Sequence, residues 1–154
     1  MKNKQNTIVV LLSLATMIGM TKSGYSQDTN REKAVKAYYN GFVSKDWNAV
    51  ASQLADGFTF TSPANDNDHI PLEKFKSECW PTNKFMKSVS FIKMFESGDE
   101  LALLVQITTT DNKLVRNVDI YNFNSAGRIK AIEVFFGPGI GYPGNTSITP
   151  TSTH

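Results

Sequence analysis

The sequence predicts an α+β domain in which helices near the N-terminus pack on one face of an antiparallel sheet. In the first half, apolar residues recur at three- and four-residue steps, the spacing of one helix face. The second half instead holds four segments rich in β-branched and aromatic residues. Short turn segments separate these four, and connections of that length join only antiparallel neighbours. With 154 residues, 40% of them hydrophobic, the chain has the size and composition of one globular domain.

Two helices are expected at the start of the domain. Residues 32–44 carry small and aromatic side chains at the steps that line one helix face. Asp46 is placed to cap a second helix, in which Val50 and Leu54 share a face and which ends before Gly57. Both helices therefore offer an apolar face to the rest of the domain.

The middle of the chain is expected to hold one short strand and one more helix. The strand covers residues 58–61 and stops at Pro63, and residues 64–69 form a polar loop. Pro71 suits the first turn of the next helix, because that turn leaves its N–H groups unpaired in any case. Pro81 is expected to halt this helix.

The rest of the chain is expected to form an antiparallel meander. The four predicted strands are residues 87–96, 101–110, 114–123 and 129–136. Together with the helices, they make up a domain of residues 27–137.

Residues 1–26 have the layout of an export signal. Lys2 and Lys4 precede an apolar run at residues 8–20, and small residues precede a cleavage site after Ser26. The run is too short to cross a bilayer of roughly 30 Å as a helix. We therefore expect an exported protein, periplasmic or secreted, that makes no membrane contact once the signal is removed. A buried N-terminal helix is the alternative.

The charge of the chain changes when this signal is removed. The full chain has a net charge of +2, but residues 1–26 hold three of its 16 basic residues and none of its 14 acidic ones. The remaining Lys and Arg residues are scattered rather than clustered, so nucleic acid is not an expected partner. Residues 138–154 are rich in Gly, Ser and Thr and are predicted to form a flexible tail.

The sequence gives no motif for a metal or a cofactor, and none is expected. The single Cys79 shares an apolar helix face with Leu72 and Phe75, which favours a buried, unreactive thiol. The loop at residues 65–69 is rich in Asp and Asn, but it lacks the glycine and the distal acid of a calcium loop. Its side chains are expected to cap the following helix instead.

The strand at residues 114–123 places a carboxyl group among apolar side chains. By the two-residue period, one face carries Val115, Asn117, Asp119, Tyr121 and Phe123. The other face carries Leu114, Val118 and Ile120. Both faces are partly apolar, which indicates helices on one side and a pocket or a second subunit on the other. Desolvation would raise the pKa of Asp119 and let the neutral acid donate to an oxyanion. The alternative is an ion pair with a Lys or Arg across the sheet.

Three motifs carry a resemblance to a known superfamily. They are AVKAYYNGFVSKDW (34–47), LADGFTFTSP (54–63) and VDIYNFNSAGRIKAIEVFF (118–136). In order and spacing they resemble the nuclear transport factor 2-like superfamily, particularly its SnoaL-like and ketosteroid isomerase-like branches. The resemblance covers about residues 31–138. It implies a cone-shaped curved sheet around a long N-terminal helix, with an apolar cavity between them, often in a homodimer.

The resemblance also implies candidate catalytic residues. In ketosteroid isomerases a Tyr and a protonated Asp form the oxyanion hole, and a second Asp moves the proton. The first two positions fall on Tyr38 and Asp119, whereas the third falls on Ser62. A serine hydroxyl is no base near neutral pH. Asp66, Asp68 and His69 of the adjacent loop are the possible substitutes, and Asp68 and His69 are the candidate acid/base groups. The alternative is a structural core in which Asp119 satisfies the Tyr38 hydroxyl.

Three functions stay open on this basis. The first is an exported protein whose pocket binds a small, mostly apolar molecule. Besides Tyr38 and Asp119, the expected ligand-binding residues are Phe42, Phe60, Ser62, Trp80, Phe91, Tyr121 and Phe135. The second is an isomerase, cyclase or dehydratase that uses Tyr38 and Asp119 to stabilise an oxyanion. The third is a noncatalytic dimerisation or interaction module.

Overall fold

The computed structural model describes residues 29–63 and 67–136. The predicted export signal (1–26) and the predicted tail (138–154) lie outside these residues. The described part is an α+β fold, as predicted, with one long helix packed on a curved six-stranded sheet. No helix in this part is both long enough and apolar enough to cross a bilayer.

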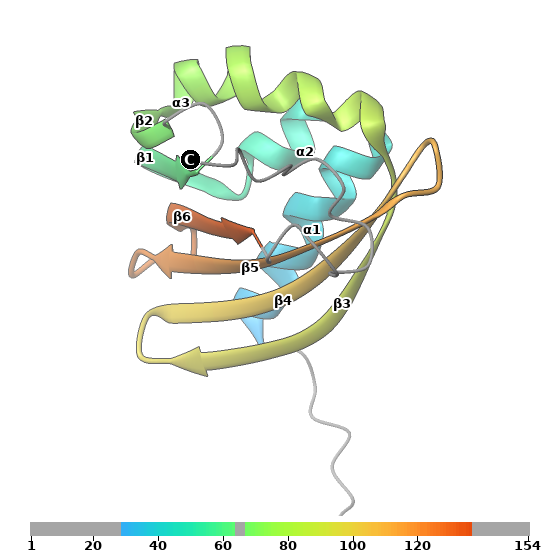
Figure 1. Ribbon diagram of the computed structural model, residues 1–154. Helices are drawn as coiled ribbons and strands as arrows, with labels where there is room; N and C mark the ends of the chain where they lie inside the picture. The colour runs from blue at the N-terminus through green and yellow to red at the C-terminus, as the bar shows by residue number, and fades with distance from the viewer. Residues whose placement is uncertain (1–28, 64–66, 137–154) are drawn as a thin grey trace, which may run out of the picture.

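The sheet has the strand order β2-β1-β6-β5-β4-β3. The strands are β1 (Leu54–Ser62), β2 (Asn67–Pro71), β3 (Met86–Ser97), β4 (Glu100–Thr109), β5 (Leu114–Phe123) and β6 (Ile129–Phe136). The last four form the predicted antiparallel meander. The pairing of β1 with β6 is parallel and was not predicted, because these strands are distant in the sequence. Figure 1 shows β3 and β4 bending around the long helix.

The helix α1 (Asn30–Ser44) lies inside the curve of the sheet. Its N-terminus is capped by the Thr29 side chain, which accepts a hydrogen bond from the backbone N–H of Glu32. The Asp46 side chain caps α2 (Trp47–Ala51) by accepting from the N–H of Ala49, as predicted. The helix α2 is shorter than expected, because Leu54 belongs to β1 and pairs with Ile129 of β6.

The segment after β1 differs from the prediction. Asn67 and Asp68 belong to β2, which pairs antiparallel with β1 through a register shift. The expected capping by this segment is therefore wrong: the residue before the next helix is Pro71, which makes no side-chain cap. Asn67 is instead buried at the start of β2.

Three short helical segments follow β2 without a break. They are α3 (Leu72–Lys74), the π-helix η2 (Phe75–Cys79) and the 3-10 helix η3 (Trp80–Phe85). Pro81 was expected to halt this segment but does not. It lies in the first turn of η3, where its missing N–H leaves no hydrogen bond unmade.

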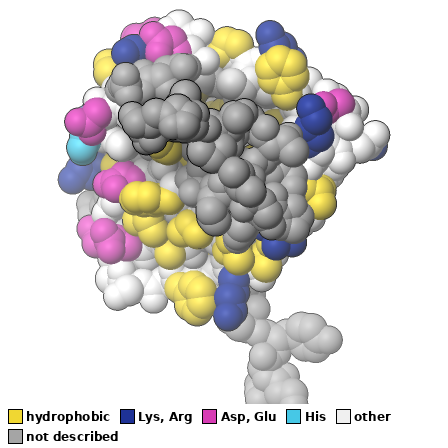
Figure 2. Space-filling model, viewed as in Figure 1, with side chains coloured by type: hydrophobic (Ala, Val, Ile, Leu, Met, Phe, Trp, Pro, Cys, Tyr) yellow, Lys and Arg dark blue, Asp and Glu magenta, His cyan; other side chains and the backbone are white. Residues whose placement is uncertain are grey.

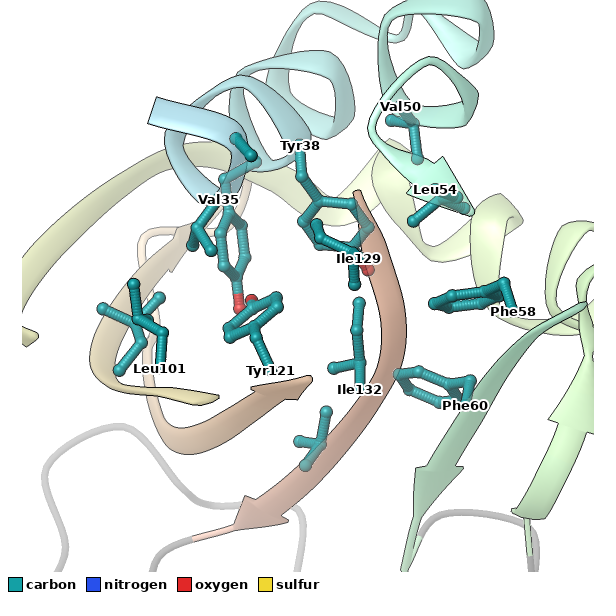
Figure 3. Packing of buried hydrophobic residues seen from close by; sticks show 14 of the residues in the cluster. Val35, Tyr38, Val50, Leu54, Phe58, Phe60, Leu101, Tyr121, Ile129 and Ile132 are labelled. Carbon is teal, nitrogen blue, oxygen red and sulfur yellow. The ribbon is translucent and has the colours of Figure 1, made fainter. Parts of the chain in front are cut away.

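The core fills the space between α1 and the concave face of the sheet. Val35 and Tyr38 of α1 face Tyr121, Leu101 and Ile132 of the sheet (Figure 3). A second group of aromatic rings surrounds Phe75, whose ring centroid lies 4.9 Å from that of Phe60 and 5.3 Å from that of Phe58. These rings join the helical turns to β1.

The packing of α1 on α2 depends on Gly41. A β-carbon built at this glycine would lie 2.7 Å from Cγ2 of Val50 and 3.0 Å from its backbone nitrogen. The two helices can approach this closely only because position 41 has no side chain.

We expect Gly41→Ala to lower the free energy of unfolding by about 1–3 kcal/mol, because the added methyl overpacks the contact between α1 and α2. Urea denaturation measures this change. The sign is diagnostic, since a helical Gly→Ala change without a clash would stabilise the protein by ~1 kcal/mol. The added variant Val50→Ala should reduce the penalty of Gly41→Ala, because it removes the nearest atom.

Candidate functional site

A cavity of about 190 Å³ lies between α1, the concave face of the sheet and the turns of η2 and η3. Its apolar lining residues are Tyr38, Phe42, Phe60, Phe75, Met86, Ile107, Ile132 and Val134. Its more polar lining residues are Tyr39, Ser62, Asn67, Glu78, Cys79, Thr82, Asn117 and Asp119. A mostly apolar wall with a few polar groups is typical of a small-molecule site.

The buried carboxyl group of Asp119 is the centre of the polar part. Its Oδ2 accepts hydrogen bonds from the Tyr39 hydroxyl of α1 and from the Tyr121 hydroxyl of β5, the latter at 3.2 Å. Tyr38 was the tyrosine predicted for this position. The partner is its neighbour Tyr39, and the two side chains point about 100° apart around the helix. Tyr38 lines the cavity, and its ring centroid lies 6.2 Å from that of Tyr121.

Burial raises the pKa of Asp119 to about 6, although the hydrogen bonds from Tyr39 and Tyr121 act in the opposite direction. Burial raises the pKa of both tyrosines well above the usual 10. The next largest cause is the charge of Asp119 for Tyr39, and the charge of Tyr39 for Tyr121. Both hydroxyls therefore stay protonated and donate to Asp119. Their protons are already engaged and do not form a free oxyanion hole.

Three buried oxygen atoms of the cavity residues have no hydrogen-bond partner among the described residues. They are Oδ1 of Asp119, Oδ1 of Asn117 and Oδ1 of Asn67. The exposed fractions of these residues are 1%, 7% and 3%. Leaving a buried acceptor unpaired costs about 1–3 kcal/mol. A ligand or water that donates hydrogen bonds in the cavity would remove this cost.

The local structure explains how these three residues come to line one cavity. Asn117 and Asp119 lie two residues apart on β5, so they share its concave face. Asn67 opens β2, where it pairs with Ser62 of β1. Its amide nitrogen lies 3.7 Å from Cys79 Sγ, a weak hydrogen bond.

The π-helix η2 supplies the wall opposite the sheet. Phe75, Glu78 and Cys79 of this element line the cavity. Short π-helical segments are frequent at functional sites. Burial raises the pKa of Cys79 to about 11, so the thiol is protonated at neutral pH and a poor nucleophile.

Several of the expected ligand-binding residues do meet at the cavity. Phe42, Phe60 and Ser62 line it together with Tyr38 and Asp119. Other expected residues lie behind the wall. The Trp80 ring packs 5.0 Å from that of Phe42, the Phe91 ring packs 5.8 Å from that of Tyr39, and Tyr121 acts through its bond to Asp119.

Three expected site residues lie away from the cavity. The side chains of Asp68 and His69 are 80% and 68% exposed and bond to each other on β2. The irregular pairing of β2 turns both outward, while Asn67 and Ile70 are buried. Phe135 is 53% exposed, because the strand alternation of β6 turns it to the outer face of the sheet.

Sequence reasoning missed Tyr39, Asn67 and Asn117 as site residues. Asn117 was predicted to share a strand face with Asp119, and this shared face could have identified it as a site residue. Asn67 carried no signal, because its segment was predicted to be a loop. Within residues 29–63 and 67–136, no three metal-ligating side chains gather.

Comparisons with known proteins agree with the fold. No family model and no curated protein matches this sequence. Solved structures of nuclear transport factor 2-like proteins do match, over most of their length. The chain has the nuclear transport factor 2-like fold, as the resemblance implied.

One similar structure is a nuclear transport factor 2-like protein of unknown function from Cytophaga hutchinsonii. It is 23% identical, with a TM-score of 0.56, and the match covers 75% of this chain and 96% of that one. Another such protein, from Burkholderia pseudomallei, is 17% identical, with a TM-score of 0.58 and coverage of 71% and 92%. A proposed ketosteroid isomerase from Kribbella flavida is 14% identical, with a TM-score of 0.58 and coverage of 74% and 82%. These identities establish the shared fold only.

We expect the free energy of unfolding to decrease as the pH rises from about 4 to about 6, because of Asp119. In this window the unfolded chain releases the Asp119 proton, while the folded chain, whose pKa is about 6, retains it. The stability contributed by Asp119 is therefore greatest below its pKa in the unfolded chain. It is lost as the pH rises to its pKa in the folded chain. The loss amounts to about 3 kcal/mol at 1.36 kcal/mol per pKa unit.

The measurement compares urea denaturation of the wild type and of Asp119→Asn at pH 4, 5, 6 and 7. The Asn variant keeps an oxygen for the two tyrosine hydroxyls and does not titrate. The difference between the two proteins should change across this window and level off above it. A difference that is constant from pH 4 to 7 would show that the Asp119 pKa is not raised.

Proposed function

We propose that this protein binds a small, mostly apolar molecule in the cavity beside Asp119. The observation that carries the proposal is the combination of an aromatic wall with three buried, unpartnered oxygens. A protein cavity of about 150 Å³ holds one benzene molecule, so about 190 Å³ suits one ring with a short substituent.

The hydrogen bonds of the two tyrosine hydroxyls favour a binding function over the reaction of ketosteroid isomerases. Tyr39 and Tyr121 donate to Asp119 and are not free to stabilise an oxyanion. Ser62 occupies the position of the proton-moving acid, and Asp68 and His69 point away from the cavity. None of these three residues therefore brings a general base to the cavity, and Asp66 lies outside the described residues.

An isomerase, cyclase or dehydratase is the second candidate function. One observation favours it: Asp119 borders the cavity, and its pKa of about 6 is close to neutral. A carboxyl group with such a pKa can take up and release a proton during a reaction. Consumption of an enolisable aromatic ketone by the wild type but not by Asp119→Asn would support this function over simple binding.

We expect Val134→Phe to abolish binding of small aromatic probes. Val134 lines the cavity and pairs with Asp119 across the sheet, so a phenyl ring would fill the space beside the carboxyl group. Thermal unfolding with and without indole and 2-phenylethanol measures binding as a rise in the melting temperature.

Val118→Phe is the matched control for this experiment. Val118 is 40% exposed on the outer face of the same pair of strands, so the same enlargement leaves the cavity unchanged. The control should keep the probe-dependent rise. Equal rises in Val134→Phe and Val118→Phe would place the binding site elsewhere.

We also propose that the outer face of the sheet forms a homodimer. Val118 and Phe135 pair across β5 and β6 and are 40% and 53% exposed. Phe95 of β3 is likewise exposed. Figure 2 shows hydrophobic side chains reaching the surface on the visible face of the molecule. Apolar patches of this kind commonly mark protein interfaces.

We expect Phe135→Asp to convert the dimer to a monomer, because a symmetric interface would bury the new charge twice. Light scattering after size-exclusion chromatography measures the mass. Phe85→Asp is the control, since Phe85 is 55% exposed but belongs to η3. A wild type that already elutes as a monomer would contradict the proposal.

A further inference from the structure

We propose that the cavity selects a ligand whose apolar body ends in a protonated amine, which donates hydrogen bonds to Oδ1 of Asp119 and Oδ1 of Asn117. This inference rests on the proposed binding function and names the chemical class of the ligand. An arylalkylamine is the simplest molecule of this class that suits the cavity.

The first argument is the hydrogen-bonding character of the two oxygens. Both are buried acceptors without a partner among the described residues. An ammonium group has three donors and no acceptor, so it complements a pair of acceptors. A ligand carbonyl or carboxylate would instead place a third acceptor against them.

The second argument is the position of the two oxygens. Asn117 and Asp119 lie on the same face of β5, and their α-carbons are about 7 Å apart at the rise of an extended strand. Both residues line the same cavity, so one small head group can reach both side chains. Asn67 lies three strands away from Asp119 in the sheet.

The third argument is the charge of the cavity. None of its described lining residues is a Lys, Arg or His, whereas Asp119 and Glu78 are acids. The titratable groups near Asp119 are Tyr38 and Tyr39 of α1 and Tyr121 of β5, and its neighbours on β4 and β6 are Leu103 and Val134.

No cation among the described residues therefore balances the ionised carboxylate. Above a pH of about 6, the pKa of Asp119, this charge is present and desolvated. A buried charge is stable only when it is paired. A cationic ligand supplies the missing partner, and it gains a charge-assisted hydrogen bond in doing so.

The fourth argument is the aromatic wall. The rings of Tyr38, Phe42 and Phe60 line the cavity that holds the carboxylate. Aromatic faces attract cations and also bury the apolar body of the ligand. The wall and the two oxygens thus favour the same class of molecule.

Three probes with the same carbon skeleton test the inference by titration calorimetry at pH 7.5. They are 2-phenylethylamine, which is cationic, 2-phenylethanol, which is neutral, and phenylacetate, which is anionic. We expect the amine to bind at least about tenfold more tightly than the alcohol, and phenylacetate not to bind, because charge pairing at Asp119 distinguishes them. Lowering the pH from 7 to 5 should weaken amine binding about tenfold and leave alcohol binding unchanged.

Two variants and one control locate the effect. Asp119→Asn should lose the preference for the amine and still bind the alcohol, which also shows that the variant is folded. Asn117→Leu should weaken amine binding severalfold without the pH dependence changing. Asp68→Asn removes an exposed carboxylate outside the cavity and should leave all affinities as in the wild type.

The outcomes separate this inference from the proposed function. Equal affinity for the amine and the alcohol, or a preference that persists in Asp119→Asn, would overturn the amine inference and leave the binding function intact. Absence of binding by all three probes would contradict both.

Discussion

The arrangement of the molecule depends on one buried carboxyl group held by two tyrosine hydroxyls. Tyr39 comes from α1 and Asp119 from β5, which are 80 residues apart in the sequence. Their hydrogen bond ties the helix to the middle of the curved sheet at the place where apolar packing alone would let the helix slide or rotate. Tyr121 adds a second donor from the same strand. A directional bond inside an apolar core thus fixes the position of the layer that closes the cavity.

In this arrangement, the two oxygen atoms of the Asp119 carboxyl group have different surroundings. Oδ2 accepts hydrogen bonds from two tyrosines, whereas Oδ1 is buried without a partner among the described residues, and Asp119 lines the cavity. The first oxygen holds the fold together, and the second is available to a ligand. In the proposed function, the same residue contacts both α1, through Tyr39, and the ligand.

Much of the fold could be predicted from the sequence, because it follows from local patterns. The two-residue period placed Asn117 and Asp119 on the buried face of β5, and Asp46 was correctly expected to cap α2. Partners set by tertiary contacts could not be predicted this way. Tyr38 and Tyr39 are adjacent and both buried, so the pattern of burial does not say which one reaches Asp119.

The unpredicted parts of the site share a physical cause. The strand β2 exists because β1 offers it an edge, and its own residues resemble a turn. Its irregular pairing buries Asn67 and turns both Asp68 and His69 outward. The two-residue period of a regular strand does not predict this pattern. The two-residue period of β6 does place Phe135 on the outer face of the sheet. An aromatic residue is usually buried, however, so Phe135 was expected in the pocket.

The central place of β6 in the sheet has a consequence for how the protein is made. This strand is the last of the described elements in the sequence, yet it lies between β1 and β5 and is the link between them. While β6 is still inside the ribosome, β1 and β2 share no edge with β3, β4 and β5. The two parts of the sheet, β2-β1 and β5-β4-β3, therefore cannot join until β6 has left the ribosome, and until then the edges that β6 later pairs with are open.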